Sequence, residues 1–275
     1  MTDDAAATLS AARDRVADER DAVAAKREAY EEFRREIARI PVEGVDDDGA
    51  AGGVAAGASS ASGAVACRAP AVGDAGSRIG TVRERFATLI RPHSLADVET
   101  SGPTETLAET IEAEFDAGVA RLLTEPGCRF TPETSAHLRT LAATRRDELG
   151  AMESVLAREA ESLDAAADLF ADAERTVETA CDPDPLTLGF DALRARHEEL
   201  GRVRDRCGEA LDARQGLLQQ PAGGTDAFDI DHREAVRYLY ESLDATYPVL
   251  AAGTDLLERC ADARETLRDQ ITRRV

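Results

Sequence analysis

Apolar side chains recur every seven residues along much of this 275-residue chain. The first series is Leu9, Val16, Val23, Tyr30 and Ile37, and a second is Leu149, Leu156, Leu163, Phe170 and Val177. A heptad series places its members along one side of a helix, and such a helix needs a partner helix to bury them. The pattern therefore predicts long helices that pack on one another, with no competing β-hairpin signal.

Prolines and glycines divide the chain into helices. Long helices are predicted over residues 3–40, 132–181 and 185–219, two shorter ones over 79–90 and 107–123, and a last pair, from about 232 to the end, divided at Pro248. The short turns at 182–185 and 220–231 favour antiparallel neighbours. We predict an all-α fold, an elongated antiparallel helical bundle or coiled coil with the two short helices at one end. The alternative is a looser coiled coil in which the first helix pairs with a second chain.

A segment rich in Gly, Ala and Ser separates the first helix from the rest of the chain. Segments of this composition bury too little apolar area to become ordered. We therefore expect an N-terminal coiled-coil helix over 1–40, a flexible linker over 41–77 and a helical body over 78–275. A linker of this length allows the first helix to pack on the body as one domain.

The chain is strongly acidic, with 54 Asp and Glu against 33 Lys and Arg, a formal net charge of -21. Lys26 is the only lysine. This charge disfavours nucleic acid and anionic membranes as partners, and it suits a cytoplasm of molar salt, where charges are screened over about 3 Å. A DNA mimic or a binder of basic partners is the alternative. The N-terminus lacks a signal-peptide pattern and no segment resembles a membrane span, so we expect a cytoplasmic protein.

The sequence offers no recognisable catalytic constellation. Its five cysteines are widely spaced, its four histidines form no HExxH pattern, and phosphate-binding glycine motifs are missing. We therefore expect no catalytic residues, no cofactor and no metal, and we do not favour an enzyme.

Five residues are the candidates for an interaction site: His93, Arg214, Tyr238, Tyr240 and Tyr247. His93 follows Arg91-Pro92 in a predicted loop, where a histidine can serve as a base or ligand. Tyr240 and Tyr247 are seven residues apart and are predicted to share a helical face, while Tyr238 points elsewhere. The alternative is structural: a histidine at a helix end, and tyrosines in a core with their hydroxyls at its edge.

Several short motifs, taken in order, resemble an uncharacterised haloarchaeal coiled-coil family. They are Arg27-Glu28-Ala29-Tyr30-Glu31-Glu32-Phe33, Pro92-His93, Phe130-Thr131-Pro132-Glu133, Arg158-Glu159-Ala160-Glu161-Ser162-Leu163, Arg214-Gln215, Tyr238-Leu239-Tyr240 and Tyr247-Pro248-Val249-Leu250. Members of that family carry Tyr after the Pro-His pair, where this chain has Ser94. The resemblance implies a helical fold and a haloarchaeal cytoplasm, and it implies no activity.

Heptad seams without a catalytic motif favour a non-enzymatic interaction or scaffold protein that binds a partner, or itself, through those seams. One alternative is a ligand-sensing or regulatory protein that uses the His93 loop and the Tyr238–Tyr247 end. An unrecognised enzyme is a further alternative.

Overall fold

A computed structural model describes residues 3–42, 77–96, 105–182, 184–219 and 231–273. Its elements in these ranges are helices, which confirms the predicted all-α helical bundle. The chain divides into two units: residues 1–23 with 150–275 form the first, and residues 24–149 form the second. Helices α1 (Asp3–Arg39) and α6 (Pro132–Cys181) contribute to both units.

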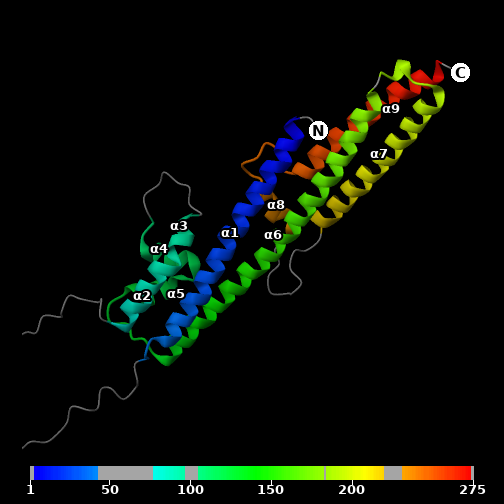
Figure 1. The fold of residues 1–275 in the computed structure, drawn as a ribbon. Coiled ribbons are helices and arrows are strands. Elements are labelled where there is room, and N and C mark those ends of the chain that lie inside the picture. The colour runs from blue at the N-terminus through cyan, green and yellow to red at the C-terminus, as the bar shows by residue number, and fades with distance from the viewer. Residues whose placement is uncertain (1–2, 43–76, 97–104, 183, 220–230, 274–275) are drawn as a thin grey trace, which may run out of the picture. The chain divides into compact units, whose positions relative to one another are not determined.

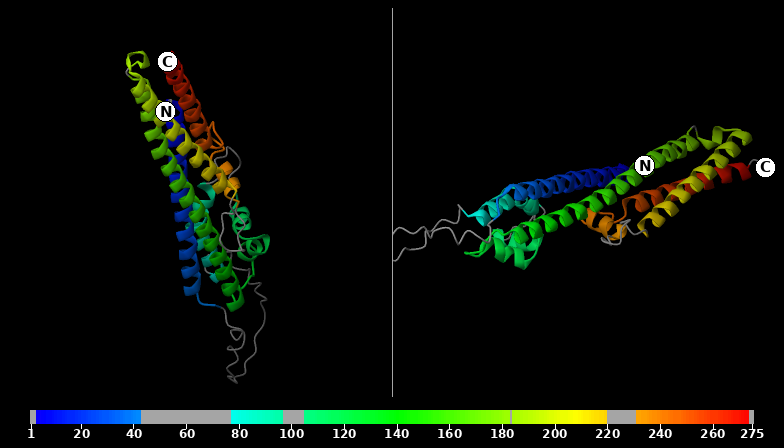
Figure 2. Two further views of the ribbon diagram at one scale, coloured as in Figure 1. Left: turned by 90° about the vertical axis from the view of Figure 1, so that its right-hand side faces the viewer. Right: turned by 90° about the horizontal axis from the view of Figure 1, so that it is seen from below.

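In the first unit, the second part of α6 runs beside α7 (Phe190–Leu218) and α9 (Pro248–Thr272), and the short helix α8 (His232–Leu239) lies against them (Figures 1 and 2). The α6–α7 turn reverses the chain direction, as predicted. Asp184 caps the single turn of 3-10 helix in this turn, Pro185–Thr187, by accepting a hydrogen bond from the Leu186 amide at 2.9 Å. The Arg196 guanidinium then donates back to the Ala180 carbonyl at 3.0 Å, so the two helices are antiparallel.

Gly253 lies where side chains from two other helices of this unit pack directly against the α9 backbone. A Cβ atom built at Gly253 of α9 would lie 2.5 Å from Cδ2 of Leu211 on α7 and 2.8 Å from Cζ of Phe170 on α6. Both distances are shorter than any ordinary carbon contact. A side chain at position 253 would therefore force the side chains of Leu211 and Phe170, or the helices that carry them, to shift.

The second unit surrounds an aromatic core. It contains the second part of α1, the first part of α6, α2 (Arg78–Leu89), α3 (Arg91–Ala96), α4 (Leu107–Glu114) and α5 (Ala117–Thr124). Phe33 of α1, Phe86 of α2 and Phe115 after α4 have ring centroids 5.8 to 6.2 Å apart, and Tyr30 meets Phe115 edge-on at 6.0 Å. These separations are typical of favourable aromatic pairs.

The prediction of one helix over 107–123 is wrong, because the helix breaks after Glu114. Phe115 and Asp116 leave the helical conformation, and the Asp116 side chain caps α5 by accepting from the Val119 amide at 2.8 Å. An aspartate at the first non-helical position stabilises a new helix start, which competes with continuation of the old one.

The prediction that Tyr240 and Tyr247 share a helical face is also wrong, because α8 ends at Leu239. Tyr247 is extended, with φ -131° and ψ 76°, and it precedes Pro248, the first residue of α9. A residue before proline disfavours the helical conformation, which explains the interruption.

Most of the predicted linker, residues 43–76, lies outside the described residues. Within the described ranges, Cys128, Cys207 and Cys260 are free thiols. None of the helices described here combines the length and the apolar character needed to cross a membrane.

Candidate functional site

A buried carboxylate organises the interior of the first unit. Glu159 of α6 is fully buried and accepts two hydrogen bonds from Arg214 of α7, each 2.7 Å long. The Tyr240 hydroxyl donates to the same carboxylate at 2.6 Å, and Nε2 of His232 lies 3.1 Å from it. Arg214 also donates to the Ser162 hydroxyl at 3.0 Å. We call Glu159, Arg214, His232 and Tyr240 the Glu159 cluster.

The Glu159 cluster holds a charged carboxylate in the interior. Burial raises the pKa of Glu159, but the hydrogen bonds from His232 and Arg214 outweigh burial and lower this pKa to about 2. The ionised carboxylate accepts only, so Nε2 of His232 carries the proton and donates. Burial and the nearby carboxylate raise the pKa of Tyr240, so its phenol stays protonated and also donates.

The Glu159 cluster forms hydrogen bonds with residues at both ends of α8. His232 is the first residue of α8 and Tyr240 is the residue that ends it, and both side chains bind the one carboxylate of α6. Between them, Val236 and Leu239 are buried. Asp231 caps the start of the helix by accepting a hydrogen bond from the Arg233 amide at 3.0 Å. The inner face of α8 is therefore held by polar contacts and by apolar packing.

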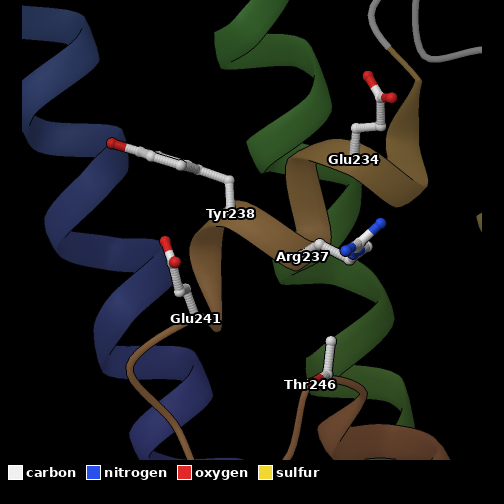
Figure 3. A pocket seen from close by; sticks show the side chains of 5 residues that line it. All are labelled: Glu234, Arg237, Tyr238, Glu241 and Thr246. Atoms are coloured by element: carbon white, nitrogen blue, oxygen red, sulfur yellow. The ribbon is translucent and has the colours of Figure 1, made fainter.

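The outer face of α8 lines a shallow hollow of about 430 Å³ (Figure 3). Its lining residues are Glu234, Arg237, Tyr238, Glu241 and Thr246. Tyr238 is 59% exposed, an unusually large exposed fraction for an aromatic side chain in this chain. Figure 3 shows the carboxylate of Glu241 extending toward the side on which the Tyr238 ring lies. An exposed aromatic ring beside carboxylates is a surface that suits a cation.

The structure brings Arg214 and Tyr240 together in the Glu159 cluster, and it places Tyr238 on the opposite face of the same short helix. Tyr247 lies at the start of α9, half-buried, and its hydroxyl accepts from Nε of Arg233 at 3.2 Å. Four of the five candidate residues thus belong to the first unit.

His93 belongs to the second unit and lies in a helix, so its prediction as a loop residue is wrong. The chain turns helical again after Ile90, and the His93 amide donates to the Ile90 carbonyl at 3.0 Å. Pro92 fits there because it occupies the first turn of α3, where its missing N–H costs no hydrogen bond.

The second unit has a buried carboxylate of its own, Glu114 at the end of α4. It accepts from the Lys26 ammonium at 2.8 Å, from the Ser94 hydroxyl at 2.5 Å and from the Tyr30 hydroxyl. Burial raises the pKa of Glu114, and the contacts with Lys26, Ser94 and Tyr30 reverse that effect and lower it. Arg145 of α6 donates to the Glu114 carbonyl at 2.6 Å and so caps the end of α4.

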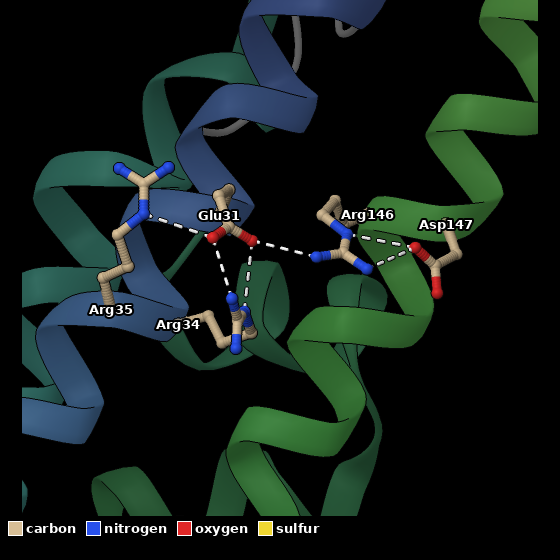
Figure 4. A network of polar contacts seen from close by, with 5 residues as sticks. All are labelled: Glu31, Arg34, Arg35, Arg146 and Asp147. Carbon is tan, nitrogen blue, oxygen red and sulfur yellow. Dashed lines mark hydrogen bonds and ion pairs between the residues drawn. The ribbon is translucent and has the colours of Figure 1, made fainter.

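A more exposed network joins α1 to α6 within this unit (Figure 4). The Glu31 carboxylate accepts from Arg34 at 2.8 Å, from Arg35 at 3.1 Å and from Arg146 of α6 at 3.0 Å. The contact with Arg34 contributes most to lowering the pKa of Glu31 to about 2. Arg146 also pairs with Asp147 at 2.6 Å. Exposed ion pairs stabilise a fold only weakly, so this network orients side chains more than it stabilises the unit.

Sequence reasoning missed Glu159 and His232. Glu159 lies three residues after Leu156, at a companion position of the heptad series, where Ala166 and Ala173 follow it and are buried. A charged residue on an apolar seam is a usable signal, because it must find a partner when the seam is buried. His232 could not be identified in this way, because it is the first residue of a short helix and lies on no heptad series. No three His, Cys, Asp or Glu side chains among the described residues gather as a metal site.

Comparisons with known proteins give one match. A search of curated proteins and a search of solved structures each find no match. A family model described as a domain of unknown function, DUF7260, matches residues 7–264. The predicted likeness to an uncharacterised family is thereby confirmed, while the predicted haloarchaeal origin stays a prediction. Because the match covers almost the whole chain, the protein belongs to the DUF7260 family.

Proposed function

We propose that this protein is a non-enzymatic interaction module that binds a basic segment of a partner protein on the outer face of α8. The observation that supports the proposal is that the two faces of α8 have different environments. Its inner side chains are fastened to the Glu159 carboxylate, and its outer face carries the exposed Tyr238 at the edge of a hollow.

The chemistry of the hollow suits a cationic side chain. Two carboxylates, Glu234 and Glu241, and one guanidinium, Arg237, line the hollow, and Tyr238 offers an exposed ring. An arginine or lysine of a partner can stack on the ring and pair with a carboxylate. The net charge of -21 attracts a basic segment from a distance and raises its association rate.

Rigidity of the surface supports the same assignment. Binding costs less entropy when the contact residues are already fixed, and α8 is fixed from within by two charge-assisted hydrogen bonds. Tyr and Arg are also the residue types that most often dominate the binding energy of protein interfaces.

The sequence predicts that a partner binds along the heptad seams. In the structure, the heptad residues of α1 are buried inside this chain. Leu9, Val16 and Val23 of α1 are all at most 7% exposed. Their burial supports a partner surface elsewhere than along this seam. Self-association through the seams stays a prediction, which sedimentation equilibrium at several protein concentrations would test.

A fluorescent peptide of alternating Arg and Leu residues is the probe for the α8 surface, with a Glu-Leu peptide of equal length as its counterpart. We expect saturable binding of the Arg-Leu peptide, measured by fluorescence anisotropy, and at least about 10-fold weaker binding by Tyr238→Ala and Glu241→Gln, which equals a loss of about 1.4 kcal/mol.

The control is Glu258→Gln, which removes an exposed carboxylate from α9. It changes the net charge as much as Glu241→Gln does, so it measures diffuse attraction to the acidic chain. Equal weakening by Glu258→Gln and Glu241→Gln would contradict the assignment of the site to α8.

A further inference from the structure

The α7–α9 pair contains an arginine without a counterion. In the part of the chain that the structure describes, Arg264 of α9 has neither a hydrogen bond nor an ion pair, and its Nε atom is buried. Its neighbours on the same helix are paired: Arg259 with Glu174 at 2.5 Å and Arg268 with Glu265 at 2.9 Å. Arg264 is half-buried, so its guanidinium has lost part of its hydration without gaining a counterion.

The register of the two helices places more positive charge around Arg264. Gly253 lies against Leu211, and Arg264 lies against Gly201, where a Cβ atom would be 3.8 Å from Nη2. These two contacts show that α7 and α9 run antiparallel. His197 lies one turn before Gly201 on α7, and Arg268 lies one turn after Arg264 on α9. Because the two helices are antiparallel, both steps lead in the same direction, so His197 and Arg268 lie at the same level of the helix pair.

The electrostatics agree with this register. Burial lowers the pKa of His197 first, and the positive charges of Arg264 and Arg268 lower it further. Glu198 acts in the opposite direction, but its carboxylate is engaged by Arg194 at 2.9 Å. Arg264 therefore places an uncompensated positive charge near His197, and Arg268 adds to it although Arg268 is also paired with Glu265.

We propose that Arg264, Arg268 and His197 form a binding site for an oxyanion of the phosphate class, either free phosphate or a phosphate ester. The guanidinium of Arg264 has its donors unused, and a guanidinium binds two oxygens of a phosphate in its plane. Gly201 has no side chain to cover that guanidinium. His197 and Arg264 are half-buried and Arg268 is exposed, so the site opens to solvent.

Phosphate fits this site better than a carboxylate because it presents more oxygens and carries up to two negative charges. Three groups on two helices can then share one anion. Binding would also favour protonation of His197, since the anion offsets the repulsion by the two arginines.

The test uses the full chain with inorganic phosphate and follows the ring nitrogens of its histidines by NMR at constant ionic strength. We expect a saturable change at His197 with a dissociation constant in the millimolar range, while His93 and His137 remain unchanged. Acetate is expected to bind at least about 10-fold more weakly. A methyl phosphate ester that matches phosphate would extend the site to esters, and one that fails to bind would restrict it to free phosphate.

Arg264→Gln is expected to abolish the saturable response, and Arg175→Gln, on the exposed side of α6, serves as the matched control. A stabilisation by phosphate in thermal unfolding, lost in Arg264→Gln and in His197→Gln, is the second readout. A linear response at His197 equal to that with chloride, an unchanged response in Arg264→Gln, or acetate binding as tight as phosphate binding would overturn the proposal.

Discussion

Replacing Glu159 by Gln tests whether the Glu159 cluster holds α8 in place. The substitution keeps the size of the side chain and removes its negative charge. Arg214, which is only 3% exposed, then keeps its positive charge without a counterion, and the phenol of Tyr240 faces a weaker acceptor. The change acts on the free energy of unfolding of the first unit.

The magnitude follows from the burial of the pair. Removing one partner of a buried ion pair costs about 3–5 kcal/mol, because the remaining charge stays desolvated. With a urea dependence of about 3 kcal/mol/M, this loss lowers the midpoint of urea unfolding by about 1 M or more. Replacing both partners, as in Glu159→Leu with Arg214→Met, should recover much of the lost stability, since no buried charge then remains.

Urea unfolding followed by circular dichroism at 222 nm measures the loss. Glu161→Gln is the control, because Glu161 lies two residues further along α6 and is exposed. We expect the control to change the free energy of unfolding by less than about 0.5 kcal/mol. A loss of less than about 1 kcal/mol in Glu159→Gln would refute the reasoning that the cluster depends on this charge.

Three further predictions follow from the same structure. The pKa of Glu159 is about 2 in the folded state, below its ordinary value of 4.5. Its contribution to the free energy of unfolding is therefore present above pH 4.5 and is lost as the pH falls toward 2. Urea unfolding at pH 6, 4.5 and 3 should show that the free energy of unfolding declines less with falling pH in Glu159→Gln than in the wild type. Gly253→Ala should destabilise the first unit by about 1–3 kcal/mol, since its methyl group would overlap the Leu211 side chain, and a thermal midpoint equal to that of the wild type would show that the neighbouring side chains move aside without cost. Lys26→Met should cost about 1–3 kcal/mol by leaving the Glu114 carboxylate without its ammonium partner, and hydrogen exchange should place the loss in α4; unchanged exchange there would contradict it.

The long helices could be predicted because their apolar positions repeat. α6 begins at Pro132 and ends at Cys181, the bounds that the heptad series and its flanking breakers predict. Helix ends elsewhere were harder, because local side chains compete with periodicity. The Asp116 cap divides a stretch whose apolar spacing continues, and Pro248 forces Tyr247 out of the helix.

The buried clusters were predictable only in part. Arg214 lies seven residues after Cys207 and Lys26 three after Val23, so each is a charge on an apolar seam that must find a partner. Their partners come from distant parts of the chain, since His232 lies 73 residues from Glu159 and Tyr240 lies 81 residues from it. Such pairings depend on how the helices pack, which a periodic pattern does not specify.

The outward orientation of Tyr238 also depends on how the helices pack, which the sequence pattern does not specify. The sequence pattern separates it from Tyr240, but which of the two faces the interior is decided by the carboxylate on α6 that Tyr240 reaches. Once Tyr240 is turned inward, Tyr238 is on the outer face and 59% exposed.

Mapping the Arg-Leu peptide on the full chain by NMR tests the central claim most directly. The account predicts that chemical-shift changes concentrate at residues 233–246, with the largest changes at Arg237, Tyr238 and Glu241, and that they saturate at one peptide per chain. Changes spread evenly along the acidic surfaces of α6, α7 and α9, with α8 unaffected, would contradict it.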